Sequence, residues 1–93
     1  MRTIAALGAA VIPAFVNPAA GSAADVTAAL RNAGCFEVHE VPPDRVMQAV
    51  ESAVREGASR IVAAGGDGTI SAAAAAIARS DVELAVVPAG TAS

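Results

Sequence analysis

The feature that most constrains the fold of this chain is the segment Arg60–Ile70, which reads RIVAAGGDGTI. It opens with a short apolar run, long enough for one buried strand, and stops at three glycines grouped around Asp67. An alanine-rich stretch with helical character follows directly. A strand, a tight glycine turn and a helix in this order bring backbone N–H groups together around an anion. Glycine has no Cβ to hold a phosphate away, so the segment predicts a phosphate-binding turn.

Short apolar runs elsewhere in the chain predict further strands. The continuous apolar character of the third and fourth is typical of strands inside a parallel sheet, whereas the second mixes apolar and charged residues and is expected at an edge. The four predicted strands are Val11–Val16, Phe36–Val41, Ile61–Ala64 and Glu83–Val87.

Stretches with helical spacing lie between these strands. The first begins at Ser22, where Ser22 and Asp25 have the spacing of a capping box, and is expected to stop at Gly34. The second follows Pro42-Pro43-Asp44 and ends at Gly57, and the third covers Ile70–Arg79. The order β-α-β-α-β-α-β predicts an α/β fold, a three-layer α-β-α arrangement with a mostly parallel open sheet of about four strands.

Turns that contain glycine follow the first, third and fourth predicted strands. Ligands of open α/β sheets bind at the carboxyl ends of the strands, so three turns are expected to meet at one site. Asp67 is the candidate to hold Mg²⁺ or to position a nucleophilic hydroxyl, and is therefore the candidate catalytic residue. A plain tight turn is the alternative for each segment. The candidate nucleotide-binding residues are Asn17, Pro18, Gly21, Ser22, Gly65, Gly66, Asp67, Gly68, Thr69, Gly90 and Thr91.

Composition excludes several classes of function. The chain has 93 residues, at most one small domain, and a net charge of −3. Its six basic residues are all arginines scattered along the chain, so no basic patch for nucleic acid is expected. The absence of lysine excludes a Walker A loop and a Schiff base. Cys35 and His39 lack partners nearby in sequence and are expected to be structural and surface residues, respectively; a single cysteine fits a reducing compartment.

Three motifs in order, Val16-Asn17-Pro18-x-x-Gly21, Gly65-Gly66-Asp67-Gly68-Thr69 and Pro88-Ala89-Gly90-Thr91, resemble the catalytic domain of the diacylglycerol kinase family. This family includes bacterial lipid kinases, sphingosine kinases and ceramide kinases. The resemblance runs from about Phe15 to the last residue. The Gly-Gly-Asp-Gly element is shared with NAD kinases and phosphofructokinases, whereas the other two motifs favour the lipid-kinase branch.

This resemblance implies transfer of the γ-phosphoryl group of ATP to a lipid hydroxyl with Mg²⁺, as in phospholipid biosynthesis. By the same resemblance, the three turns line the nucleotide site and Asp67 belongs to the metal and phosphate network. Ser93 stands where the family usually has Asn. The family also has a second, mostly β domain that brings the acceptor lipid and a catalytic carboxylate. Residues 1–93 are therefore expected to be a truncated N-terminal nucleotide-binding subdomain, inactive alone.

Other interpretations stay open. The chain could be a non-catalytic nucleotide-binding or assembly module, or a NAD-kinase-like enzyme. A cytoplasmic location is expected, with peripheral contact to the inner membrane face as a further expectation. An exposed apolar edge would favour a homodimer. Arg2 and the apolar Thr3–Val16 have the pattern of a signal peptide, but a short leader into the first strand is the favoured interpretation.

Overall fold

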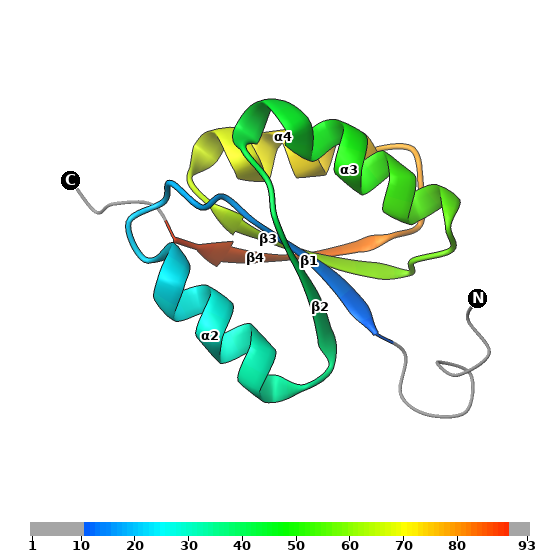
Figure 1. The fold of residues 1–93 in the computed structure, drawn as a ribbon. Coiled ribbons are helices and arrows are strands. Elements are labelled where there is room, and N and C mark those ends of the chain that lie inside the picture. The colour runs from blue at the N-terminus through cyan, green and yellow to red at the C-terminus, as the bar shows by residue number, and fades with distance from the viewer. Residues whose placement is uncertain (1–10, 90–93) are drawn as a thin grey trace.

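The computed structural model describes residues 11–89, and within them strands and helices alternate as the sequence predicts (Figure 1). The predicted α/β class is thereby confirmed. In chain order the elements are β1 (Ile12–Val16), α2 (Ala23–Ala33), β2 (Phe36–Glu40), α3 (Pro43–Arg55), β3 (Arg60–Gly65), α4 (Asp67–Ile77) and β4 (Glu83–Pro88).

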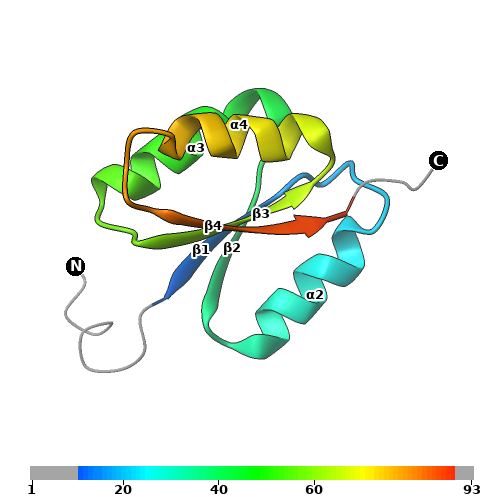
Figure 2. The same cartoon turned by 180° about the vertical axis from the view of Figure 1, so that it is seen from behind.

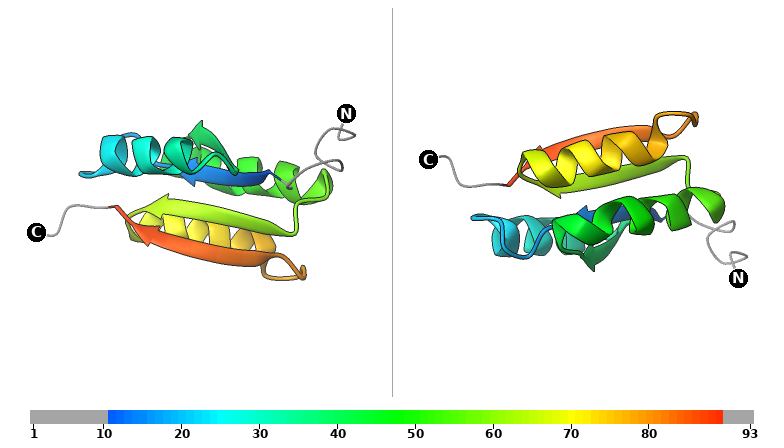
Figure 3. Two further views of the ribbon diagram at one scale, coloured as in Figure 1. Left: turned by 90° about the horizontal axis from the view of Figure 1, so that it is seen from below. Right: turned by 90° about the horizontal axis from the view of Figure 1, so that it is seen from above.

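The strands form one 4-stranded parallel sheet in the order β2-β1-β3-β4. Helices α3 and α4 cover one face and α2 covers the other, as the two opposite views show (Figures 1 and 2). Seen from above, α4 lies over β3 and β4 and α3 runs beside it (Figure 3). The chain moves from β1 to β2 on one side and then to β3 on the other. Because βαβ crossovers are right-handed, this change of direction places α2 on one face of the sheet and α3 and α4 on the other.

The position of β4 corrects one expectation. The sequence predicted an interior strand, but in the described part of the chain β4 pairs with β3 alone and lies at the edge of the sheet. Val86 is 45% exposed there. A continuous apolar run indicates that both faces of a strand are covered, and Leu84 and Val87 do pack against the two core clusters. Such a run does not indicate whether the strand has a hydrogen-bonded neighbour strand on each side. The interior place of β3 and the edge place of β2 are confirmed.

Two apolar clusters hold the layers together. Between the sheet and the α3–α4 pair, Phe15 and Ile61 pack on Val46 and Val50. On the opposite face, Val16 and Ala64 pack against Ala23 of α2. Many of these side chains are alanines, which let helices and strands approach closely. The second cluster lies directly beneath the carboxyl ends of β1 and β3.

Two helix starts differ from expectation. Helix α4 begins at Asp67, not at Ile70, so the last glycine of the motif lies inside its first turn. The low helix propensity of glycine moved the predicted start later, but the extended backbone of Gly66 serves as the N-cap. At α2, Ser22 is the N-cap residue but its side chain makes no capping bond, so the predicted capping box does not form. The predicted stop at Gly34 is confirmed by its positive φ of 83°.

Candidate functional site

The order of the strands reverses between β1 and β3, and the first two predicted turns leave the sheet at this point. The N–H of Asn17, the first residue after β1, donates to the carbonyl of Ala64 at 3.0 Å. Gly65 and Gly66 then end β3 and lead into α4. A reversal of strand order opens a crevice at the carboxyl edge of an α/β sheet, where ligands bind. Both turns therefore start at the position that the fold favours for a ligand.

The third turn is tied to the other two by backbone bonds. The N–H of Ala89, directly after β4, donates to the carbonyl of Gly65 at 3.1 Å. The carbonyl of Ala89 accepts the N–H of Ser22 at 3.0 Å and the Ser22 hydroxyl at 3.1 Å. The structure thus brings the three turns together as far as Ala89. The candidates Gly90 and Thr91 lie outside the described residues.

The first turn is shaped by its asparagine. The Oδ1 atom of Asn17 accepts the N–H of Ala19 at 3.0 Å, and the Asn17 carbonyl accepts the N–H of Ala20 at 3.1 Å. Bonds of this kind let an asparagine side chain imitate a backbone turn. Pro18 and Gly21 are exposed, so the turn presents backbone to solvent at the sheet edge.

Gly65 lies in close contact with Thr69 of α4. A Cβ built on Gly65 would lie 2.8 Å from Thr69 Cβ, 2.8 Å from Thr69 Oγ1 and 3.2 Å from Asn17 Cβ. Thr69 is only 1% exposed, and within the described residues its buried Oγ1 has no hydrogen-bond partner. A buried hydroxyl without a partner is rare in a folded protein and costly, and it lies here between two of the candidate turns.

In contrast to the packed contact between Gly65 and Thr69, the first residues of α4 are open to solvent. Asp67 and Gly68 are exposed, and a Cβ on Gly66 would meet nothing within 4 Å. The N–H of Ile70 makes the bond to Gly66 O at 3.1 Å, and the N–H groups before it have no partner within the helix. These groups carry the positive end of the helix dipole, which attracts anions. The geometry is therefore suited to a phosphate.

A magnesium ion would have to be held by few protein ligands here. Within residues 11–89, no three His, Cys, Asp or Glu side chains gather where they could share a metal ion. Asp67 is the single acidic residue in the three turns, residues 17–22, 65–69 and 88–91. Mg²⁺ is commonly bound by one or two carboxylates together with waters and substrate phosphates. One exposed carboxylate beside the candidate phosphate-binding turn fits that mode of binding.

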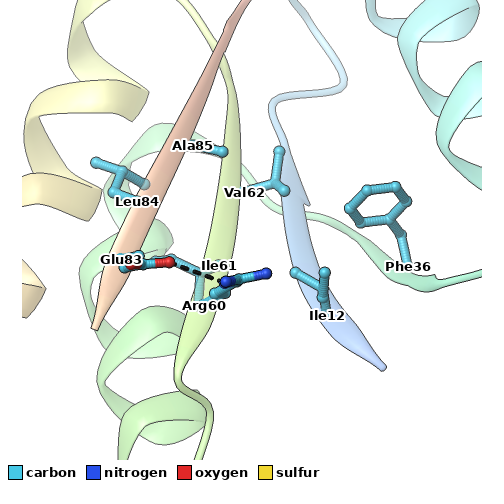
Figure 4. A pocket seen from close by; sticks show the side chains of 8 residues that line it. All are labelled: Ile12, Phe36, Arg60, Ile61, Val62, Glu83, Leu84 and Ala85. Atoms are coloured by element: carbon cyan, nitrogen blue, oxygen red, sulfur yellow. Dashed lines mark hydrogen bonds and ion pairs between the residues drawn. The ribbon is translucent and has the colours of Figure 1, made fainter. Parts of the chain in front are cut away.

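A hollow of about 470 Å³ lies away from these turns, toward the amino ends of the strands (Figure 4). Its floor is the α2-facing side of the sheet, with Ile12, Phe36 and Val62 among its apolar residues. Arg60 and Glu83 form an ion pair at its rim, with 2.8 Å between Nε and Oε1. An apolar surface with one neutralised cation offers little to a polyphosphate. The hollow is therefore not the candidate nucleotide site.

The two residues for which the sequence suggested no ligand role are not part of the three turns. His39 stacks on Phe15, with ring centroids 5.4 Å apart, and its Nε2 lies 3.4 Å from a Glu37 carboxylate oxygen. Cys35 is a free thiol before β2. Among the described helices, none combines the length and apolar character that crossing a bilayer requires.

The contribution of Ala89 was missed from the sequence. An alanine has no functional side chain, so composition alone gives no signal for it. Its role depends on its N–H and carbonyl, which join Gly65 to Ser22. The sequence feature that could have indicated this role is the position of Ala89 between the end of a predicted strand and a predicted ligand-binding turn.

Comparison with known proteins gives a family match and a relative of similar sequence. Residues 12–93 match the family model described as the diacylglycerol kinase catalytic domain. Over 49 residues the chain is 47% identical to sll0036, an uncharacterized protein of Synechocystis sp.. That match covers 53% of this chain and 11% of the Synechocystis protein. The chain thus corresponds to a small part of that relative's length.

Proposed function

The chain belongs to the family of the diacylglycerol kinase catalytic domain, and from that membership we propose that its three turns bind ATP with Mg²⁺ for phosphoryl transfer to a lipid hydroxyl. The observation that supports this most is the bond from Asn17 N–H to Ala64 carbonyl. It joins the first turn to the end of β3, at the reversal of strand order where α/β sheets bind nucleotides.

In this proposal each turn contributes backbone more than side chain. Gly66 and Gly68 let the phosphates approach the start of α4, and the unpaired N–H groups there neutralise part of their charge. Asn17, Pro18 and Gly21 border the nucleotide on the side of β1, and Gly90 and Thr91 are proposed to bind it as well. Because the chain contains no lysine, backbone amides and Mg²⁺ replace the usual cationic side chain.

Asp67 is the residue that we assign to Mg²⁺. Its carboxylate is exposed at the first turn of α4, beside the N–H groups proposed to hold the phosphates. Bound there, the metal would supply charge stabilisation for the phosphoryl group. Asp67 would hold it directly or through water and so belong to the catalytic machinery.

The acceptor lipid is proposed to bind through a second, β-rich domain that is not part of residues 1–93. That domain would also bring a further carboxylate to the site, and contact with a membrane surface would give access to the lipid. On this account the 93 residues bind nucleotide but do not turn over alone.

A second candidate is a nucleotide-binding module without catalysis. It is favoured by one observation, that Asp67 is the single acidic residue of the three turns. Phosphoryl transfer to a hydroxyl uses both a metal ligand and a group that accepts the hydroxyl proton, and these turns offer one carboxylate for the two roles.

Calorimetric titration of the 93-residue chain with ATP, with and without Mg²⁺, tests the proposal. Mg²⁺-dependent binding is expected, because the metal screens the triphosphate beside Asp67. Binding that is equal with and without Mg²⁺ would favour the non-catalytic module. A folded chain that binds no ATP would contradict nucleotide binding by these residues.

A further inference from the structure

We propose that Ser22 is a positioning residue of the nucleotide site, which holds Ala89 at the end of β4 against the start of α2. Its consequence for nucleotide binding rests on the proposed function. The sequence placed Ser22 among the residues that touch the nucleotide. The structure supports a different role, in which Ser22 acts through Ala89.

Two donors of Ser22 converge on one acceptor. The backbone N–H lies 3.0 Å and the Oγ atom 3.1 Å from the carbonyl oxygen of Ala89, 67 positions away in sequence. Ser22 is itself anchored to the helix, because its carbonyl accepts the N–H of Val26 at 3.0 Å. The hydroxyl would ordinarily cap α2, but it makes no capping bond. Its proton is instead directed to the third turn.

Both backbone polar groups of Ala89 are hydrogen-bonded. Its N–H donates to the Gly65 carbonyl at 3.1 Å, and its carbonyl accepts both Ser22 donors. Its side chain is fully buried in the cluster with Val16, Ala23 and Ala64. In the described residues β4 has a strand on one side only, so backbone pairing restrains its end from one direction. Ser22 supplies the restraint from the other. Ala89 is therefore held from both sides at the carboxyl end of the sheet.

Backbone hydrogen bonds therefore connect the three turns in series: Asn17 N–H to the Ala64 carbonyl, Ala89 N–H to the Gly65 carbonyl, and Ser22 N–H to the Ala89 carbonyl. The series returns to its starting point, because Ser22 belongs to the same turn as Asn17. Removing the hydroxyl leaves the backbone bond in place. The expected effect is therefore graded and not a loss of the fold.

The test compares Ser22→Ala with Ser22→Thr, which keeps the hydroxyl, and with Ser59→Ala, an exposed serine outside the three turns. In the chain without nucleotide, amide hydrogen exchange of Ala89 is measured against that of core amides such as Val50. We expect Ser22→Ala to speed exchange at Ala89 by about threefold to tenfold, the range that one net hydrogen bond gives. Exchange at Val50 follows global unfolding and should speed by no more than exchange at Ala89 does, whereas both sites should stay unchanged in the two comparison variants.

The second readout is the Kd for ATP with Mg²⁺. Ser22→Ala should raise it by a factor similar to that on exchange, and Ser22→Thr should restore it. Unchanged exchange at Ala89 in Ser22→Ala would overturn the positioning role. Faster exchange with an unchanged Kd would overturn the link to the nucleotide. If the unaltered chain binds no ATP, the proposed function fails, while the exchange data still decide whether Ser22 holds Ala89.

Discussion

Gly65 and Thr69 are packed so closely that no side chain fits between them. A Cβ on Gly65 would lie 2.8 Å from both Thr69 Cβ and Thr69 Oγ1, a distance that Cβ atoms essentially never show. One glycine of the motif is therefore required by packing. Gly66, its neighbour, has open space where its Cβ would lie. The two adjacent glycines thus have separable roles, one in holding α4 on β3 and one in leaving room at the site.

Replacing Gly65 by alanine should destabilise the fold. The added methyl group would force Thr69 and the start of α4 away from β3, and overpacking of this kind costs about 1–3 kcal/mol. The free energy of unfolding from urea denaturation measures it. The matched control is Gly66→Ala, for which we expect a change within about 0.5 kcal/mol, because the poorer N-cap of alanine is offset by the lower conformational entropy of its unfolded chain. Equal losses in both variants would contradict the packing role of Gly65.

Gly66→Ala should instead weaken nucleotide binding. Its methyl group would occupy the open space at the N-cap of α4, where the phosphates are proposed to approach the backbone. We expect a Kd for ATP at least about tenfold higher, which corresponds to about 1.4 kcal/mol. An unchanged Kd would show that the phosphates do not approach at Gly66.

Thr69→Val should separate stability from binding. The buried hydroxyl has no partner within the described residues, so replacing it with a methyl group of similar shape should leave unfolding unchanged or stabilise it by about 1 kcal/mol. If the hydroxyl serves the nucleotide, the Kd for ATP should rise at the same time. A clear loss of stability would indicate instead that the hydroxyl makes a stabilising bond in solution.

Asp67→Asn should remove the effect of Mg²⁺ on ATP binding. An amide is a far weaker ligand for this hard cation than a carboxylate, so affinities with and without the metal should become equal. Asp44→Asn is the matched control, since Asp44 is also exposed and lies in the first turn of a helix, α3. Both changes remove a favourable charge near a helix N-terminus, worth about 0.3–1 kcal/mol. A metal effect that persists in Asp67→Asn would contradict its assignment.

The Arg60–Glu83 pair across β3 and β4 should contribute little to stability. The two side chains are 65% and 71% exposed, and exposed pairs contribute about 0.2–1 kcal/mol in double-mutant cycles. Arg60→Ala, Glu83→Ala and the double variant measure the coupling, which should fall further in high salt. A coupling well above 1 kcal/mol would show that the pair is shielded from solvent.

The order of elements could be predicted because each apolar run and its spacing reflect which faces are buried. The edge position of β4 could not, since Leu84 and Val87 pack against the same kinds of neighbours that an interior strand would have. The start of α4 was predicted three residues late because glycine is a poor helix former, whereas Gly66 and Gly68 are accepted at the N-terminus, where the backbone is only partly paired.

The glycine motif, the asparagine turn and their convergence followed from residue types at strand ends. The link between Ser22 and Ala89 could not be predicted from the sequence. Its acceptor is a backbone carbonyl 67 positions away, and the local pattern of Ser22 and Asp25 favoured a capping bond instead. Tertiary contact decided which partner the hydroxyl takes.

The most direct test of a nucleotide site built from these turns is backbone amide NMR of the 93-residue chain during titration with ATP, with and without Mg²⁺. We expect shifts that Mg²⁺ strengthens and that cluster at Gly65–Thr69 and at Asn17–Gly21, with little change around the hollow near Ile12 and Phe36. Unchanged amides in both turns up to millimolar ATP, in a chain that is demonstrably folded, would contradict it.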